Sequence, residues 1–265
     1  MQKSNITIFK RNEVARGTDM YSLNAKKCFN AIYYIYQKNR DMFAQYEDNN
    51  ISYMSLKFST LRDIMGLQRD NNYVEVIKDA IRELQITLIE LNNWINPANG
   101  KKYAWYSTKF LNDANVEHDN IVTVQLEIST LFKQLMRAHI NFTPLDLVQY
   151  MNKFRTKYAM KLYEYLKSFG NYKYLDIPQS HLMRLFGIDE DNKTYKNFAQ
   201  IRRLLERQLK ELVSKSDLKE LKLDDSKQLK KDKIFRIYIN PRAKKKTASK
   251  VDTEQVLESL SIKKF

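Results

Sequence analysis

The sequence predicts an α+β fold that is predominantly helical and built from two similar units in tandem. Three observations lead to this prediction. The 265 residues contain 43% hydrophobic and 12% aromatic side chains, enough for the core of one large domain or two ordinary ones. Only five glycines and four prolines occur, so most of the chain is expected to be regular structure. Finally, residues 59–91 and 180–212 carry nearly the same pattern, so one fold is expected twice.

The repeated pattern aligns without a gap. Gly66 aligns with Gly187, and an Asp-Asn pair follows each glycine at the same offset. The other identical pairs are Tyr53 and Tyr174, Ser59 and Ser180, Leu61 and Leu182, Arg82 and Arg203, Leu84 and Leu205, Leu88 and Leu209, Glu90 and Glu211, and Leu91 and Leu212. Two unrelated helices would share some leucines, but the common glycine and Asp-Asn pair favour an internal repeat.

Each unit begins with an aromatic-rich helix, expected over 26–37 and 156–168, and continues with a short alternating segment, ISYMSLKF or YKYLDIPQ. A short helix follows. Ser59 or Ser180 is expected to cap its start, and Gly66 or Gly187 to end it in the left-handed conformation that glycine tolerates.

After a polar turn, each unit has a longer helix, expected from Tyr73 to about Leu84 and from Tyr195 to about Val213. Two strand-like runs close each unit: ITLIEL and YAWYSTKF around the turn NPANG, and LKELKL and KIFRIYIN around DDSKQLKKD. This order of helix, short helix, turn, long helix and hairpin is typical of a winged helix-turn-helix.

Between the units lie a further strand, IVTVQLEIS, a helical stretch, STLFKQLMRAH, and the connector INFTPLDLVQYMNKF. Thr143 and Pro144 are expected to start a helix in this connector, as N-cap and first helical residue. We therefore predict an N-terminal domain over 1–142, a C-terminal domain over 143–240, and a basic, flexible tail over 241–265 that contains the lysines 244–246.

The charge of the chain indicates its partner. Lys plus Arg number 46 against 31 Asp plus Glu, a formal net charge of +15 with a pI near 9.6, which favours an anionic partner and nucleic acid ahead of a membrane surface. The first 140 residues hold 18 basic and 15 acidic side chains and the rest hold 28 and 16, so the excess is C-terminal. A basic protein that is merely soluble is the alternative.

The long helix of the C-terminal unit has the pattern of a DNA-reading helix. Its apolar positions recur at helical spacing and predict a buried face: Tyr195, Phe198, Ile201, Leu205, Leu209 and Leu212. The opposite stripe consists of long cationic and amide side chains, the types that contact guanine edges, adenine edges and phosphates: Lys193, Lys196, Asn197, Gln200, Arg203 and Arg207. Lys230 and Lys231, with Lys227 and Lys233 nearby, offer phosphate contacts from the hairpin turn. An ordinary solvated helix face is the alternative.

The long helix of the N-terminal unit has different charges at the aligned positions, including Glu75 and Asp79. Carboxylates repel phosphates, so this helix cannot read DNA in the same way. We expect it either to touch DNA lightly, through Asn71, Asn72, Lys78 and Arg69, or to turn its apolar Val76 and Ile86 toward another protein chain.

Signals of catalysis and of metal binding are missing. The Gly100-Lys101 pair is followed by Lys102, and Ile95 stands where a phosphate-binding loop needs its first glycine. The histidines 118, 139 and 181 are far apart, and one cysteine cannot form a zinc knuckle. We therefore predict no catalytic residues, no metal and no cofactor, and a binding protein rather than an enzyme. A lone nucleophile among the 17 tyrosines is not excluded.

The expected location is the cytoplasm. The N-terminal residues have no apolar signal region, and no run of eighteen uncharged apolar residues occurs, so no membrane is expected as a partner. The single Cys28 fits a reducing compartment and is expected to be a small core residue.

The C-terminal half resembles a known family. It contains KYAMKLYEYLK, then L-x-x-x-x-G-I, then Y-K-x-F-x-x-I-R-R-L-L-E-x-x-L-K-E-L, and finally the alternating strand KIFRIYI. In this order, the motifs resemble the second winged-helix domain of the iteron-binding plasmid replication initiators, the RepA, RepE and Pi superfamily. The N-terminal repeat agrees with the degenerate first winged-helix domain of that family.

The resemblance implies a bacterial protein that binds directly repeated origin sites in double-stranded DNA as a monomer, melts an adjacent AT-rich region, and recruits host DnaA and the replicative helicase. It also implies a homodimer, built on the first domain, that represses its own gene and limits plasmid copy number. The second domain would then be the main DNA reader, through Lys193, Lys196, Gln200, Arg203 and Arg207, with auxiliary contact from the first. Glu75 and Asp79 depart from a base-reading pattern in the first domain.

Two other classes of function remain open. A dimeric winged-helix transcription regulator without a replication role would prefer an inverted repeat, whereas an initiator would distort AT-rich DNA beside direct repeats. A nuclease or relaxase would nick supercoiled plasmid in the presence of Mg²⁺ or Mn²⁺.

Overall fold

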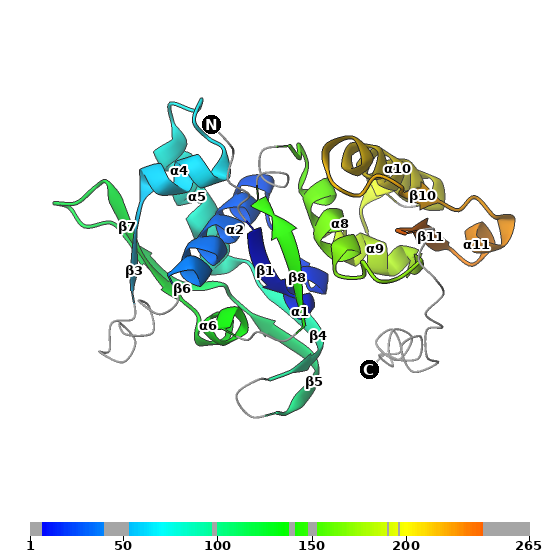
Figure 1. Cartoon of the computed structure of the whole chain (residues 1–265), viewed down its shortest axis with the longest axis horizontal. Helices are drawn as coiled ribbons and strands as arrows, with labels where there is room; N and C mark the ends of the chain where they lie inside the picture. Colours follow the sequence, from blue (N-terminus) through cyan, green and yellow to red (C-terminus); the bar gives the residue numbers. More distant parts are fainter. Residues whose placement is uncertain are drawn as a thin grey trace.

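The computed structural model describes residues 7–39, 53–96, 100–137, 141–147, 153–189, 191–195 and 197–240. Its elements gather in two groups that lie side by side (Figure 1). We call residues 7–147 the N-terminal unit and residues 153–240 the C-terminal unit. The predicted mixture of helices and strands is confirmed. The predicted predominance of helix is not, since strands form four antiparallel sheets among the described residues.

The elements of the N-terminal unit are β1 (Thr7–Arg11), α1 (Asn12–Arg16), β2 (Thr18–Asp19), α2 (Leu23–Lys38), β3 (Met54–Lys57), α4 (Phe58–Met65), α5 (Tyr73–Ile86), β4 (Ile89–Ile95), β5 (Lys102–Thr108), β6 (Leu111–Asn115), β7 (Thr123–Ile128), α6 (Thr130–Arg137) and β8 (Phe142–Asp146). Those of the C-terminal unit are α8 (Lys157–Lys167), β9 (Tyr174–Pro178), α9 (Gln179–Leu185), the 3₁₀ helix η1 (Lys193–Tyr195), α10 (Phe198–Lys215), β10 (Lys222–Leu223), α11 (Lys227–Lys231) and β11 (Ile234–Tyr238). None of these helices is long and apolar enough to cross a membrane.

The sheet of the C-terminal unit has the order β10-β11-β9, so the strand before the short helix pairs with the last strand of the hairpin. In the N-terminal unit, β3 pairs in the same way with β7, in the order β3-β7-β6. The predicted pairing of the two runs around NPANG is confirmed, since β4 and β5 are antiparallel neighbours. Their predicted place as the closing hairpin of the winged helix-turn-helix is wrong, because they pair with β2 in a separate sheet. The polar sequence of β6, LNDAN, has no apolar alternation and gave no strand signal.

The two short helices begin differently from the prediction. α4 starts at Phe58 and α9 at Gln179, one residue before the serines that were expected as N-caps. The first N–H of each helix donates to a hairpin carbonyl instead, Phe58 to Val122 at 3.0 Å and Gln179 to Lys233 at 2.9 Å. A serine cap is therefore not needed where a strand runs directly into a helix. The prediction for the glycines is confirmed, since Gly66 and Gly187 have φ angles of 75° and 60°.

The connector is a strand, which corrects the prediction of a helix that starts at Thr143 and Pro144. Residues 142–146 form β8, which pairs with β1, with Pro144 opposite Phe9. A two-stranded sheet has only edge strands, so the missing N–H of proline is tolerated. Thr143 is buried, and its hydroxyl lies 2.6 Å from Asn12 Oδ1.

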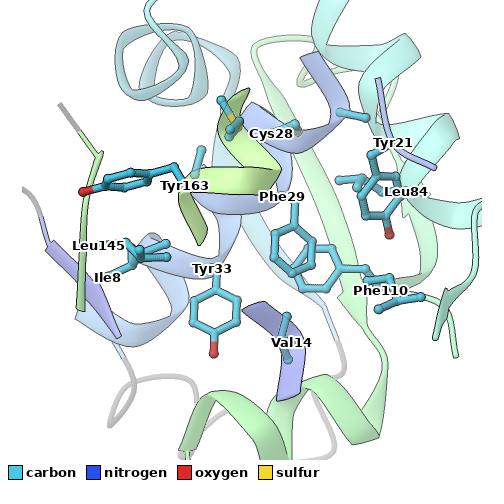
Figure 2. Packing of buried hydrophobic residues seen from close by; sticks show 14 of the residues in the cluster. Ile8, Val14, Tyr21, Cys28, Phe29, Tyr33, Leu84, Phe110, Leu145 and Tyr163 are labelled. Carbon is cyan, nitrogen blue, oxygen red and sulfur yellow. The ribbon is translucent and has the colours of Figure 1, made fainter. Parts of the chain in front are cut away.

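The apolar core is continuous between the two units. Phe29 of α2 lies among several aromatic rings of this core, with its ring centroid 4.3 Å from that of Phe110. Figure 2 shows Ile8 of β1, Leu145 of β8 and Tyr163 of α8 in the same cluster. Cys28 is fully buried there, as predicted, and burial raises the pKa of its thiol to about 12.

A cluster of buried charges lies beside this core, between α2 and α8. Lys10 Nζ donates to Glu164 Oε1 at 2.7 Å and to Asn30 Oδ1 at 2.6 Å. Asp19 accepts from Lys26 Nζ at 2.8 Å and from Lys161 Nζ at 3.1 Å. All of these side chains are almost completely shielded from water. Ionic groups therefore join the two units beside the apolar packing.

Candidate nucleic-acid interface

The long helix α10 begins at a well-formed cap. The Asn197 side chain accepts a hydrogen bond from Gln200 N–H at 3.0 Å, and the Gln200 side chain accepts one from Asn197 N–H at 3.3 Å. This reciprocal pair is a capping box, and it starts the helix at Phe198 rather than at the predicted Tyr195. Tyr195 ends the separate helix η1 instead.

One face of α10 is locked to the rest of the C-terminal unit. Ile201, Leu205, Leu209 and Leu212 are buried, as predicted, whereas Tyr195 and Phe198 are half-buried. The Phe198 ring stacks on Phe235 of β11 with centroids 4.4 Å apart. This apolar underside fixes how the helix sits, so its opposite face is presented in one orientation.

The opposite face of α10 presents two arginines to solvent. Arg203 and Arg207 are exposed one helical turn apart, and among the described residues neither has an ion-pair partner. The exposed Lys210 continues this stripe by a further turn and was missed from the sequence. Positions 203, 207 and 210 are spaced by four and three residues, as on one face of an α-helix, and this spacing would have added Lys210 to the predicted stripe.

The first part of the predicted stripe is arranged differently. Asn197 and Gln200 hydrogen-bond each other in the capping box, so their side-chain oxygens are already engaged. Lys193 is exposed but lies on η1, not on α10. Lys196 lies outside the described residues. The structure thus places Arg203 and Arg207 together and leaves Lys193 beyond the start of the helix.

A short basic helix occupies the predicted hairpin turn. α11 is capped by Ser226, whose hydroxyl accepts from Leu229 N–H at 3.3 Å, and Leu229 is buried beneath it. Lys230 and Lys231 lie in its last turn and are exposed, as are Lys227 and Lys233. In Figure 1, α11 lies at the end of the C-terminal unit farthest from the N-terminal unit. In the sequence, a capping residue at Ser226 followed by an apolar residue at Leu229 was the signal that would have predicted this helix.

The fold and the sequence can now be compared with known proteins. A family model described as "Initiator Replication protein, WH1" matches residues 7–167, which is more than half of the chain. The chain belongs to this family. The match spans the N-terminal unit and α8, the helix that carries Glu164.

The structure of this initiator replication protein is similar to that of the Pi initiator protein in complex with iteron DNA, with a TM-score of 0.60 and 14% identity over 89% of this chain and 97% of that one. Domains 2 and 3 of RctB give a TM-score of 0.50 and 13% identity over 82% of this chain and 81% of theirs. At these identities the likeness concerns the fold. No curated protein matches the sequence.

In the N-terminal unit of this initiator, the cations of α5 are paired. Lys78 Nζ donates to Glu75 at 2.8 Å and Arg82 donates to Asp79 at 2.5 Å. The hydrogen bond from Lys78 lowers the pKa of the Glu75 carboxyl. Ile86 is exposed, as the sequence predicted. The face of α5 is therefore a mixture of neutralised charge and apolar surface.

The other N-terminal residues that the sequence singled out lie near the start of α5. Asn71 and Asn72 are exposed, and Asn72 precedes the helix without a side-chain capping bond. Val76 is half-buried and offers less apolar surface than Ile86.

The described histidines do not form a metal site. His118 is exposed, whereas burial lowers the pKa of His181 to about 4, so this ring is neutral at pH 7 and packs beside Tyr165. His139 lies outside the described residues. In the part of the chain that the structure describes, no three His, Cys, Asp or Glu side chains converge as metal ligands.

Proposed function

We propose that this chain is a plasmid replication initiator that binds directly repeated origin sites, or iterons, in double-stranded DNA through its C-terminal unit. One observation carries the proposal. The apolar face of α10 packs against the unit, while Arg203 and Arg207 are exposed on the opposite face and have no ion-pair partner in the part of the chain that the structure describes. The family membership and the likeness to the Pi initiator fold support it.

The arrangement suits a helix in the major groove. That groove admits an α-helix, and arginine pairs with the O6 and N7 atoms of guanine through two hydrogen bonds. Arg203 and Arg207 are the proposed base readers. Lys193, Lys196, Asn197 and Gln200 are proposed to contact the duplex around the start of α10, and Lys230 and Lys231 to contact phosphates from α11.

The N-terminal unit is proposed to have two other roles. Asn71, Asn72 and Lys78 would make auxiliary contacts to DNA, weakened by the pairing of Lys78 with Glu75. The exposed Ile86 and the apolar surface of the unit would serve self-association. The predicted boundary after residue 142 falls inside β8, which pairs with β1, so we propose that the first domain extends to the end of β8. The second domain would then continue to residue 240 and a tail would follow over 241–265, the two domains being tandem winged-helix units related by an internal repeat. The glycines at positive φ and the matching sheet orders support this proposal.

The later steps of initiation follow from the proposed family role. The bound monomer would open adjacent AT-rich DNA and recruit host DnaA and the replicative helicase in the bacterial cytoplasm. The homodimer would repress the gene of the protein. The protein would act as a binder and not as an enzyme, without cofactor or metal.

A binding and opening assay tests the proposal. The DNA that flanks the gene is incubated with the protein, and footprinting is combined with permanganate probing of unpaired thymines. An initiator protects direct repeats and makes thymines of an adjacent AT-rich stretch reactive. Protection of one inverted repeat, with no reactive thymines, would instead support a dimeric winged-helix transcription regulator, a function that the exposed Ile86 and Trp105 of the N-terminal unit also suit.

A further inference from the structure

One arginine connects α10 with the loop that precedes α11. Arg202 Nε donates to Glu206 Oε1 at 2.8 Å, and its Nη2 donates to Asp225. The Arg202 side chain is 19% exposed, whereas the neighbouring Arg203 lies open to solvent. Adjacent arginines of one helix therefore point in different directions, Arg202 toward the loop and Arg203 away from the protein.

Asp225 lies directly before the start of α11. The next residue, Ser226, is the N-cap of this helix. Asp224, on the other side, donates its N–H to Arg236 O at 2.9 Å and accepts from Ser226 N–H at 2.9 Å. The backbone of Asp224 thus connects the loop to β11, and the buried Leu229 anchors α11 to the core. The hydrogen bond from Arg202 to Asp225 connects the same loop to α10.

We propose that Arg202 is a positioning residue that holds the lysines of α11 at a fixed distance from Arg203 and Arg207, so that both groups reach the same duplex. This inference rests on the proposed function. A five-residue helix such as α11 is too short to be stable by itself, and ordering it on binding would cost affinity. The Arg202–Asp225 pair supplies this order before DNA arrives. Arg202 itself makes no contact with DNA.

The substitution Asp225→Asn tests the positioning role of Arg202, because the role predicts weaker DNA binding whereas the loss of a negative charge alone predicts tighter binding. It breaks the ion pair and also removes a negative charge from a surface that faces phosphates. Electrostatics alone would make DNA binding tighter. Without the positioning ion pair, binding becomes weaker, because the lysines of α11 no longer meet their phosphates. Since the Asp225 side chain is 68% exposed, the fold tolerates the change.

Asp232→Asn is the matched control. Asp232 follows the other end of α11 and is exposed, and no ion pair of its side chain occurs among the described residues. The change of charge is the same and lies beside the same small helix. This variant is expected to bind DNA as tightly as the parent protein or more tightly.

Affinity is measured by fluorescence anisotropy on the protected duplex at several salt concentrations, with hydroxyl-radical footprints of each complex. Asp225→Asn is expected to bind more weakly, with a salt slope smaller by about 1 for each phosphate that the variant no longer binds. Its footprint is expected to show no protection at the outer phosphates and to keep protection where α10 lies. Adding Lys230→Ala and Lys231→Ala to Asp225→Asn is expected to lower the DNA affinity only slightly further, because these lysines no longer meet their phosphates in that variant.

The outcomes separate the two proposals. If Asp225→Asn binds as tightly as Asp232→Asn while Arg203→Ala weakens binding, the positioning role is overturned and the proposed function stands. If Arg203→Ala and Arg207→Ala both leave affinity unchanged, the proposed function is overturned and the positioning role with it.

Discussion

The two long helices, α5 and α10, occupy similar places in their units but differ in whether the cations on their exposed faces are paired with carboxylates. Each follows a short helix and a glycine at positive φ, and each buries an apolar face. On α5, Lys78 and Arg82 are bonded to carboxylates three residues earlier. On α10, Arg203 and Arg207 have no such partner among the described residues. The same scaffold therefore presents a neutralised surface in one unit and available cations in the other.

The aromatic-rich helices of the two units, α2 and α8, both contribute to the buried charge cluster. Glu164 of α8 faces Lys10 and Asn30, and Lys161 of α8 shares Asp19 with Lys26 of α2. Desolvating such charges is costly, so these pairs must be made together. The ion pairs between the two units are buried, whereas Arg203 and Arg207 of α10 are exposed and have no ion-pair partner among the described residues.

The largest expected effect concerns the buried cluster. Glu164→Gln leaves Lys10 without its carboxylate in a site that water does not reach, and it should lower the free energy of unfolding by about 3 to 5 kcal/mol. Urea denaturation followed by circular dichroism measures this change.

Glu75→Gln is the matched control on α5, because it also removes one carboxylate that accepts from a lysine, but on the surface. It should leave the denaturation midpoint nearly unchanged. Equal midpoints for the two variants would contradict the contrast between interior and surface pairs.

The same carboxylate makes stability depend on pH. Burial alone would raise the pKa of Glu164, but Lys10, Lys26 and Lys161 outweigh it and lower this pKa to about 2. The unfolded chain has a glutamate pKa of about 4.3, so the stabilisation is complete above that pH and is lost as the pH falls toward 2. Denaturation between pH 5 and pH 3 should show a smaller loss of stability in Glu164→Gln than in the parent protein. An identical loss would show that Glu164 is not paired.

The next effect separates α10 from α5 in DNA binding. Arg203→Ala and Arg207→Ala should each weaken binding of the protected duplex by about 1 to 3 kcal/mol if these arginines contact bases. Arg82→Ala, at the aligned position of α5, removes a cation that is bonded to Asp79 and should leave binding unchanged. Anisotropy titrations measure the DNA affinity of the three variants. If Arg82→Ala loses as much affinity as the α10 variants, the proposed difference in DNA binding between α5 and α10 is contradicted.

The smallest effect concerns the helix caps. Asn197→Ala removes the capping box of α10 and should cost about 1 kcal/mol of stability. Asn72→Ala should cost much less, because the Asn72 side chain makes no capping bond at α5. Thermal unfolding of the two variants makes the comparison, and equal losses would mean that the capping box contributes nothing.

Much of the fold was predictable because its signals are local. Helical spacing of apolar residues placed the long helices, and Gly66 and Gly187 marked the positive φ angles that end the short ones. The buried side of α10 and its exposed arginines follow from the same spacing.

The parts that were not predictable depend on contacts distant in sequence. The pairing of β3 with β7, the strand at Thr143 and Pro144, and the backbone acceptors that replace the serine caps all involve partners far along the chain. The buried charges are a further case, since Lys10 and Glu164 lie 154 residues apart. In the candidate interface, the residue types of Asn197 and Gln200 indicated base contacts, but their side-chain oxygens accept hydrogen bonds within the capping box.

The central claim is that Arg203 and Arg207 read guanines in the major groove. It is tested most directly by replacing each guanine of the protected site in turn with 7-deazaguanine, which lacks the N7 acceptor. We predict that the parent protein loses affinity at one or two guanines, and that Arg203→Ala or Arg207→Ala becomes indifferent to the replacement at one of them. Equal losses at the same guanines in the parent protein and in both variants would contradict the account.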